Sequence, residues 1–114
     1  MKVELEVYRT KDGVCPYERW LHGLSVATKV RIHKAIFRMR DGNFTGCKPI
    51  KDTRIKGVFE RSMDFGPGWR VYYGLDGKTL VLLLTGGNKR TQARDIEKAL
   101  EYWNDYKTRK DGER

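Results

Sequence analysis

Residues 58–90 read VFERSMDFGPGWRVYYGLDGKTLVLLLTGGNKR, and they decide the fold that we predict for this chain of 114 residues. Apolar and polar side chains alternate through residues 58–65 and 69–73, which is typical of strands with two unlike faces. Residues 66–68 form a Gly-Pro-Gly turn, and Asp76-Gly77 is a hairpin signal before the next segment. Residues 79–85 form a continuous apolar run, as in a strand covered on both sides. The stretch therefore predicts a three-stranded antiparallel meander.

The alternation places Glu60 and Arg70 on one face of two adjacent strands, together with Tyr72. We expect this face to be polar, so that loss of Arg70 would leave folding intact. Spacing alone leaves two interpretations open. The two residues form either a cross-strand ion pair, worth about 0.2–1 kcal/mol, or part of a reactive site.

The flanking sequence adds one strand and three helices. Residues 2–9 alternate and predict the first strand of a mixed sheet. Pro16 suits the first turn of a helix over 16–22, and Ser25 can cap a helix that runs to Arg40. Residues 43–57 are polar and predict a loop or an irregular edge, whereas Thr91 can cap the last helix. We expect one α+β domain over 1–107 and a disordered basic tail over 108–114.

The chain is strongly basic, with 24 Lys and Arg against 15 Asp and Glu, a formal charge of +9 and a pI near 9.7. Such a charge attracts polyanions, so nucleic acid, an acidic protein and an anionic membrane surface all fit. Ten of the basic residues lie between Lys29 and Arg61, where only three acidic residues occur. The cations on the 25–40 helix form either a solvated face or part of an RNA or partner footprint. No apolar run has the length of a signal sequence or a membrane span, so we expect a cytoplasmic protein with no membrane contact.

Two features could carry chemistry. Gly86-Gly87 before Lys89-Arg90 resembles a phosphate cradle at a helix N-terminus, although it lacks the spacing of a nucleotide-binding P-loop. Glu60 among cations is the arrangement that a metal-free ribonuclease needs, with a base for the 2′-hydroxyl and fixed positive charge for the phosphorane. No metal-ligand cluster or protease motif occurs in the sequence, and we expect no metal and no cofactor.

The element order, taken with residues 57–74 (GVFERSMDFGPGWRVYYG) and 80–106 (LVLLLTGGNKRTQARDIEKALEYWNDY), resembles the RelE/ParE toxin superfamily. The chain is most similar to the HigB-type addiction module killer proteins, up to about residue 107. The resemblance implies a RelE-like, microbial RNase-like fold. It also implies the toxin of a type II toxin–antitoxin pair, neutralised by a small acidic or helix-turn-helix antitoxin. Many members are mRNA interferases that cut messages in the ribosomal A site without a metal, so ribosome and mRNA are implied partners.

The resemblance also implies roles for single residues. Arg70 matches the sheet arginine that contacts the scissile phosphate, and Lys89-Arg90 match the cationic pair after the last strand. Glu60 stands where some members carry a lysine and others a glutamate base. The implied catalytic residues are therefore Glu60, Arg70, Lys89 and Arg90. We expect RNA or ribosome contacts from the basic residues Arg38, Lys48, Lys51, Arg54, Lys56, Arg61 and Arg94.

One position departs from the family pattern. Several ribosome-dependent members carry an aromatic residue near the position of Ile96, and the nearest tyrosines, Tyr102 and Tyr106, lie further along the last helix. Two alternatives therefore stay open. The ParE branch of the same fold binds DNA gyrase and cleaves nothing, and charge alone would also suit a non-catalytic RNA-binding module.

Overall fold

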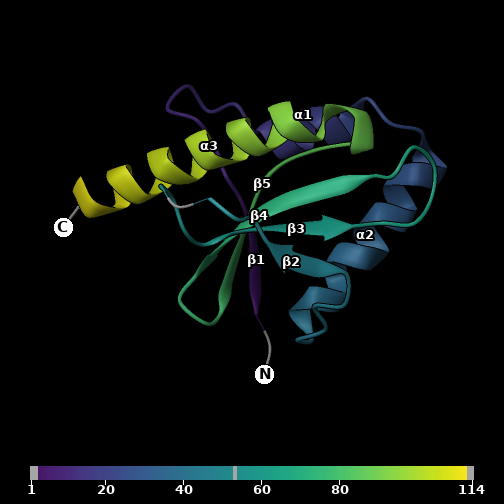
Figure 1. The fold of residues 1–114 in the computed structure, drawn as a ribbon, viewed down its shortest axis with the longest axis horizontal. Coiled ribbons are helices and arrows are strands. Elements are labelled where there is room, and N and C mark those ends of the chain that lie inside the picture. The colour runs from purple at the N-terminus through teal and green to yellow at the C-terminus, as the bar shows by residue number, and fades with distance from the viewer. Residues whose placement is uncertain (1–2, 53, 113–114) are drawn as a thin grey trace.

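The computed structural model describes residues 3–52 and 54–112. Its elements in chain order are β1 (Glu4–Val7), α1 (Pro16–His22), α2 (Val26–Arg40), β2 (Cys47–Pro49), β3 (Val58–Ser62), β4 (Arg70–Asp76), β5 (Leu80–Gly87), the 3-10 turn η1 (Lys89–Thr91) and α3 (Gln92–Gly112). The five strands form one sheet in the order β1-β5-β4-β3-β2 (Figure 1). The predicted α+β class, with a three-stranded meander and a C-terminal helix, is confirmed.

The meander has the register that brings the two candidate residues together. β3 and β4 are antiparallel, with Glu60 opposite Tyr72 and Ser62 opposite Arg70. Side chains of cross-strand partners point to the same face of a sheet. Glu60 and Arg70 therefore lie diagonally on one face, as the alternation predicts.

Both edges of the sheet come from outside the meander. β1 pairs in parallel with β5, which confirms the predicted mixed sheet. β2 pairs antiparallel with β3 at the other edge. The segment 43–57, for which we expect a loop or an irregular edge, therefore contains a short edge strand at Cys47–Pro49. A three-residue strand has too short a pattern to be recognised, and it forms because β3 offers a free edge.

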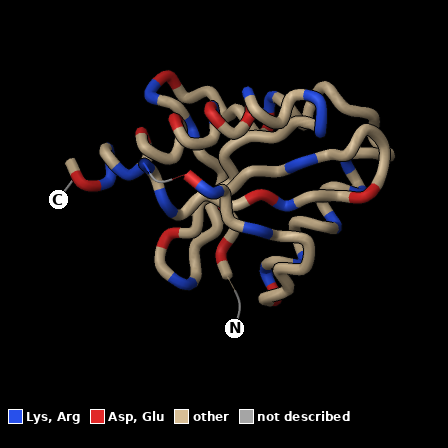
Figure 2. Tube along the Cα trace, viewed as in Figure 1, with Lys and Arg blue, Asp and Glu red and all other residues tan. Residues whose placement is uncertain are grey.

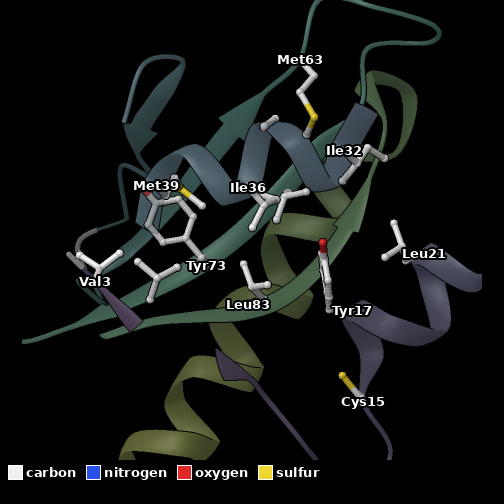
Figure 3. Close-up of a cluster of buried hydrophobic side chains, with 13 residues drawn as sticks. Val3, Cys15, Tyr17, Leu21, Ile32, Ile36, Met39, Met63, Tyr73 and Leu83 are labelled. Carbon is white, nitrogen blue, oxygen red and sulfur yellow. The ribbon is translucent and has the colours of Figure 1, made fainter. Parts of the chain in front are cut away.

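The helices cover both faces of the sheet with separate apolar cores. On one face, Ile32, Ile36 and Met39 of α2 pack near Tyr73 and Leu83 of the sheet (Figure 3). On the other face, Trp103 of α3 lies in a cluster with Tyr72. β5 is buried between these layers, as its continuous apolar run predicts.

The C-terminal helix is longer than we expected. Residues 108–112 belong to α3, so the prediction of a disordered tail is wrong for them. Lys110 forms an ion pair with Asp76 of β4, and Arg109 lies 2.8 Å from Asp105 one turn earlier. These contacts give the last turns partners that the apolar pattern does not reveal. Residues 113 and 114 lie outside the described part of the chain. Within the described ranges, no helix combines the length and the apolar character needed to cross a membrane.

Candidate functional site

Glu60 is a fully buried carboxylate at the centre of the candidate site, with 0% exposure. Gln92, in the first turn of α3, donates from Nε2 to Oε1 at 2.7 Å. The Ser62 hydroxyl donates to Oε2 at 3.4 Å. Lys48 Nζ lies 3.5 Å from Oε2, and Arg70 Nε lies 3.8 Å from Oε1. Two cations and two neutral donors thus surround the carboxylate, which compensates the cost of burying its charge.

This burial corrects the expected character of the sheet face. The alternation of β3 shows which residues share a face, but the start of α3 covers that face around Glu60. The cross-strand ion pair with Arg70 is present. A carboxylate with no exposed surface has no direct path to an RNA hydroxyl, so the arrangement suits a group that holds Arg70 better than a group that takes a proton from substrate.

Tyr72, which the alternation places on the same face, also belongs to this site. Tyr72 is fully buried, and its hydroxyl has no hydrogen-bond partner among the residues that the structure describes. Burial, with the nearby carboxylates of Glu60 and Asp95, raises the pKa of Tyr72 and keeps its hydroxyl protonated. The register of the β3–β4 hairpin could also have revealed Ser62, which lies opposite Arg70. Gln92 depends on how α3 docks, for which the sequence carries no local signal.

Arg70 also lines an open groove about 670 Å³ in volume at the end of the sheet. Its side chain is 15% exposed. Lys89 lines the same groove from η1, across from the Gly66–Gly68 turn between β3 and β4. The turn and η1 are in contact, since Lys89 N lies 3.4 Å from the Pro67 carbonyl. The structure thus brings Arg70 and Lys89 together, whereas Arg90 is exposed and does not line this groove.

The predicted phosphate cradle at the start of the last helix is not available. The Asn88 side-chain oxygen accepts hydrogen bonds from the backbone N–H groups of Arg90 at 2.9 Å and Thr91 at 3.2 Å. Asn88 is therefore the N-cap, and Thr91 completes a capping box instead of serving as the cap itself. These donors cannot bind a phosphate while they are satisfied internally.

A carboxylate, that of Asp95, also makes the start of the last helix unsuitable for a phosphate. Asp95 accepts a hydrogen bond from the Thr91 hydroxyl at 2.5 Å and lies so close to Gly87 that a Cβ there would overlap it. A negative charge therefore stands against the second glycine of the pair. Gly87 lacks a side chain because Asp95 packs against its backbone, and not because a ligand binds there.

The predicted RNA-binding residues do not form a single patch. Arg38, Lys48 and Arg61 line a groove of about 730 Å³ between α2 and the sheet edge. Lys51 lines a smaller groove of about 580 Å³ beside Glu60, which Lys48 also borders. Lys56 is exposed in the segment before β3. Figure 2 shows Lys and Arg segments along α2 and the sheet edge.

Besides Lys48, which lies beside Glu60, two of the predicted RNA-binding residues have acidic neighbours. Arg54 Nη2 lies 2.7 Å from Asp52 and 3.4 Å from Glu97. The hydrogen bonds from Arg54 lower the pKa of Asp52 to about 2, so this carboxylate stays charged and offsets the arginine. Arg94 lies 3.8 Å from Asp95. Both cations contribute less net charge than their position in the sequence suggests.

The tyrosines of the last helix lie away from the candidate site. Tyr102 stacks on Tyr8 with ring centroids 5.1 Å apart, and the Tyr106 hydroxyl donates to Asp76 at 2.8 Å. Fourteen residues separate Tyr106 from Gln92, which is about 21 Å along a helix. Ile96 is half-buried and packs against the core on the α3 face. The family resemblance implies an aromatic residue near Ile96, and neither Tyr102 nor Tyr106 lies there.

Comparison with known proteins identifies relatives of this chain. A protein of Haemophilus influenzae described as uncharacterized is 39% identical over 84 residues, which cover 73% of this chain and 81% of that protein. One chain of the toxin–antitoxin complex RelBE2 of Mycobacterium tuberculosis has a similar structure, with a TM-score of 0.57. The two are 20% identical, and the match covers 78% of this chain and all of that one. This likeness confirms the predicted RelE-like fold.

A protein-family model also matches most of the chain. The family model described as "Phage derived protein Gp49-like (DUF891)" matches residues 19–104, from α1 to α3. The matched segment contains Glu60, Arg70 and Lys89. The chain belongs to the Gp49-like family of phage-derived proteins.

Proposed function

We propose that this protein is the toxin of a type II toxin–antitoxin module and acts as a metal-independent, ribosome-dependent mRNA endoribonuclease. The observation that carries the proposal is the pairing of Arg70 and Lys89 at one groove, with Arg70 anchored by a buried carboxylate. The RelE-like fold and a structural neighbour from a toxin–antitoxin complex support it. The motif of residues 80–106 supports placement in the HigB-type branch.

The proposed roles follow from exposure and charge. Arg70 and Lys89 stabilise the charge that develops on the scissile phosphate, because both reach the same groove. Arg90 adds positive charge at its rim. Glu60 positions Arg70 and does not contact the RNA, since it is fully buried. Catalysis by charge and alignment requires a positioned arginine, and the charge of Glu60, 3.8 Å from Arg70 Nε, favours one position of its guanidinium.

The proposed partners are a cognate antitoxin, the ribosome and mRNA, and the proposed location is the cytoplasm. The antitoxin is supported by an exposed apolar stripe on α2, where Val26 is 75%, Val30 46% and Phe37 52% exposed. Exposed apolar residues in a row are typical of protein-binding surfaces. The helix-turn-helix type of antitoxin follows from the family resemblance.

The test uses purified protein, translating ribosomes and a defined mRNA. We expect a cut in the A-site codon by the wild-type protein and by Lys78→Ala, and no cut by Arg70→Ala. Lys78 is a matched control because it is an exposed cation on the β4–β5 hairpin, at the opposite end of β4 from Arg70. A wild-type protein that leaves the message intact, or an equal cut by Arg70→Ala, would contradict the proposal.

A second candidate is a ParE-like toxin that inhibits DNA gyrase by binding it. The buried state of Glu60 and the absence of an aromatic side chain at Ile96 favour this non-nuclease alternative. Inhibition of gyrase supercoiling, together with intact mRNA in the ribosome assay, would support it. RNA binding without cleavage and without effect on gyrase would instead indicate a non-catalytic RNA-binding module.

A further inference from the structure

A groove outside the candidate site is lined by residues of α1, α2, β1 and β5. Its volume is about 470 Å³, which lies within the range of pockets that bind small molecules. We call it the α1–α2 groove. It shares no lining residue with the groove of Arg70 and Lys89. What binds in the α1–α2 groove is therefore separate from the proposed nuclease, and either can fail without the other.

The base of the α1–α2 groove is apolar. Leu21, Ile36 and Leu83 line it and are buried in the core beneath α1 and α2. Leu5 and Val7 of β1 also line the groove and are half-buried. Such a lining favours a ligand with an apolar body, because contact with these side chains removes apolar surface from water.

A polar group lies among these apolar side chains, the hydroxyl of Tyr17. Tyr17 lines the groove and is 3% exposed, and its hydroxyl has no hydrogen-bond partner among the residues that the structure describes. In Figure 3 the hydroxyl points toward α2 and lies between Leu21 and Leu83, which both line the groove. Burial raises the pKa of Tyr17, so the hydroxyl stays protonated and can donate. A ligand oxygen that accepts this hydrogen bond would satisfy a donor that is otherwise buried and unpaired.

The exposed part of the lining carries a cation and an aromatic ring. Lys29 is half-buried and forms no ion pair among the described residues. Glu18, the acidic residue of the lining, lies 3.5 Å from Arg9, which offsets its charge. Phe37 is 52% exposed, and its ring stacks on His33 with centroids 6.2 Å apart. This part of the groove therefore suits a negative charge and a flat ring.

We propose that the α1–α2 groove binds a small aromatic carboxylate that carries a second oxygen at the far end of its ring, as a phenolic acid does. The aromatic body packs on the apolar base and on Phe37, the carboxylate pairs with Lys29, and the far oxygen pairs with the Tyr17 hydroxyl. The three parts of the ligand thus match the three parts of the lining.

The Tyr17 hydroxyl favours a small molecule over the side chain of a protein partner. Partner proteins fill such pockets with apolar or aromatic anchors. A leucine or phenylalanine anchor would cover the hydroxyl and leave it unpaired. A ligand with an oxygen at its buried end fills the groove and also pairs with the donor.

The experiment titrates isotope-labelled protein with para-hydroxyphenylpropionate and follows the amide NMR shifts. A ligand of this size should bind with a Kd of about 2 mM or tighter. The amides of Leu21 and His33 should shift and saturate, whereas those of Arg70 and Lys89 should not move, because they lie at another groove. Shifts centred on Arg70 and Lys89, or no saturable shift up to about 10 mM probe, would overturn the proposal.

The variant Tyr17→Phe removes the hydroxyl and keeps the ring. It should bind the phenolic probe about 2- to 12-fold more weakly than the wild type does, as the loss of one hydrogen bond implies, and phenylpropionate with unchanged affinity. Equal affinities of the wild type for the two probes would overturn the proposal and indicate the apolar anchor of a partner protein instead.

The thermal midpoint tests the state of the Tyr17 hydroxyl without any ligand. Because this hydroxyl has no partner among the described residues, the midpoint of Tyr17→Phe should equal or exceed that of the wild type. A lower midpoint would show that the hydroxyl is paired inside the protein, and it would contradict the role given to it.

The variant Lys29→Gln tests the charged end of the ligand. It should weaken binding of both carboxylate probes about 1.5- to 5-fold and leave binding of the neutral para-hydroxyphenylpropanol unchanged. Lys34→Gln is the matched control, since Lys34 is an exposed cation of α2 that does not line this groove. It should keep the wild-type affinities. An equal loss in both lysine variants would overturn the pairing with Lys29 in favour of net charge alone.

Discussion

Replacing Arg70 by alanine should destabilise the fold, although the sequence alone suggested that folding would be unaffected. Arg70 Nε lies 3.8 Å from the fully buried Glu60 carboxylate, and the Arg70 side chain is 15% exposed. At an effective dielectric constant of about 20, the attraction at this separation is about 4 kcal/mol. Lys48 and Gln92 remain to compensate the charge of Glu60. We therefore expect a net loss of about 2 kcal/mol in the free energy of unfolding.

Urea unfolding followed by tryptophan fluorescence measures this loss. With an m-value of about 2 kcal/mol per M, the midpoint of Arg70→Ala should fall by about 1 M. Lys89→Ala is the matched control, because Lys89 lines the same groove but is exposed and forms no ion pair among the described residues. Its midpoint should stay close to that of the wild type.

A double-mutant cycle identifies the cause. Once Glu60→Gln has removed the buried charge, Arg70→Ala should cost about 1 kcal/mol or more less than it does in the wild type. Equal costs in the two backgrounds, or equal midpoints for Arg70→Ala and Lys89→Ala, would refute a stabilising role of the buried pair. Arg70 would then be a surface cation, as the sequence suggested.

Three further changes have defined outcomes. Gly74→Ala should cost about 1–3 kcal/mol in thermal unfolding, because its Cβ would overlap the buried Trp103 ring, whereas Gly112→Ala meets nothing within 4 Å and should cost far less. Asn88→Ala should cost about 1 kcal/mol in urea unfolding through loss of the N-cap. Asp76 has its pKa lowered by hydrogen bonds from two α3 side chains, chiefly a lysine, so its stabilisation is complete above its unfolded pKa and is lost as the pH falls through the lower folded pKa. Between pH 5 and pH 2 the wild type should therefore lose more stability than Asp76→Asn, as measured by the thermal midpoint.

Local patterns sufficed for most of the secondary structure. Helix bounds at 16–22 and 25–40 were predictable because Pro16 and Ser25 mark the two starts. The alternation in β3 and β4 predicted that Glu60 and Arg70 share a face, since side-chain direction in a strand depends only on position. Such signals reside in the chain itself and need no knowledge of distant partners.

The grouping of the basic residues was not predictable in the same way. Arg54 and Arg38 look alike in sequence, but Arg54 lies between Asp52 and Glu97, whereas Arg38 lines an open groove. Composition gives the number of charged residues but does not show which acidic residues lie beside which basic ones. The buried side of α2 was also hidden, because Val26, Val30 and Phe37 recur at helical spacing and are nevertheless exposed.

The sequence by itself determined the strands, the helices and the side on which Glu60 and Arg70 lie, because these follow from the 2.0 and 3.6 periods of neighbouring residues. Only the tertiary structure decided that α3 covers Glu60, that Gln92 and Lys48 surround it, and that Lys89 meets Arg70. Those contacts join segments about 10 to 30 residues apart, and they depend on how a helix and an edge strand dock on the sheet. The predicted polar face thus became a buried ion pair with only its arginine at the surface.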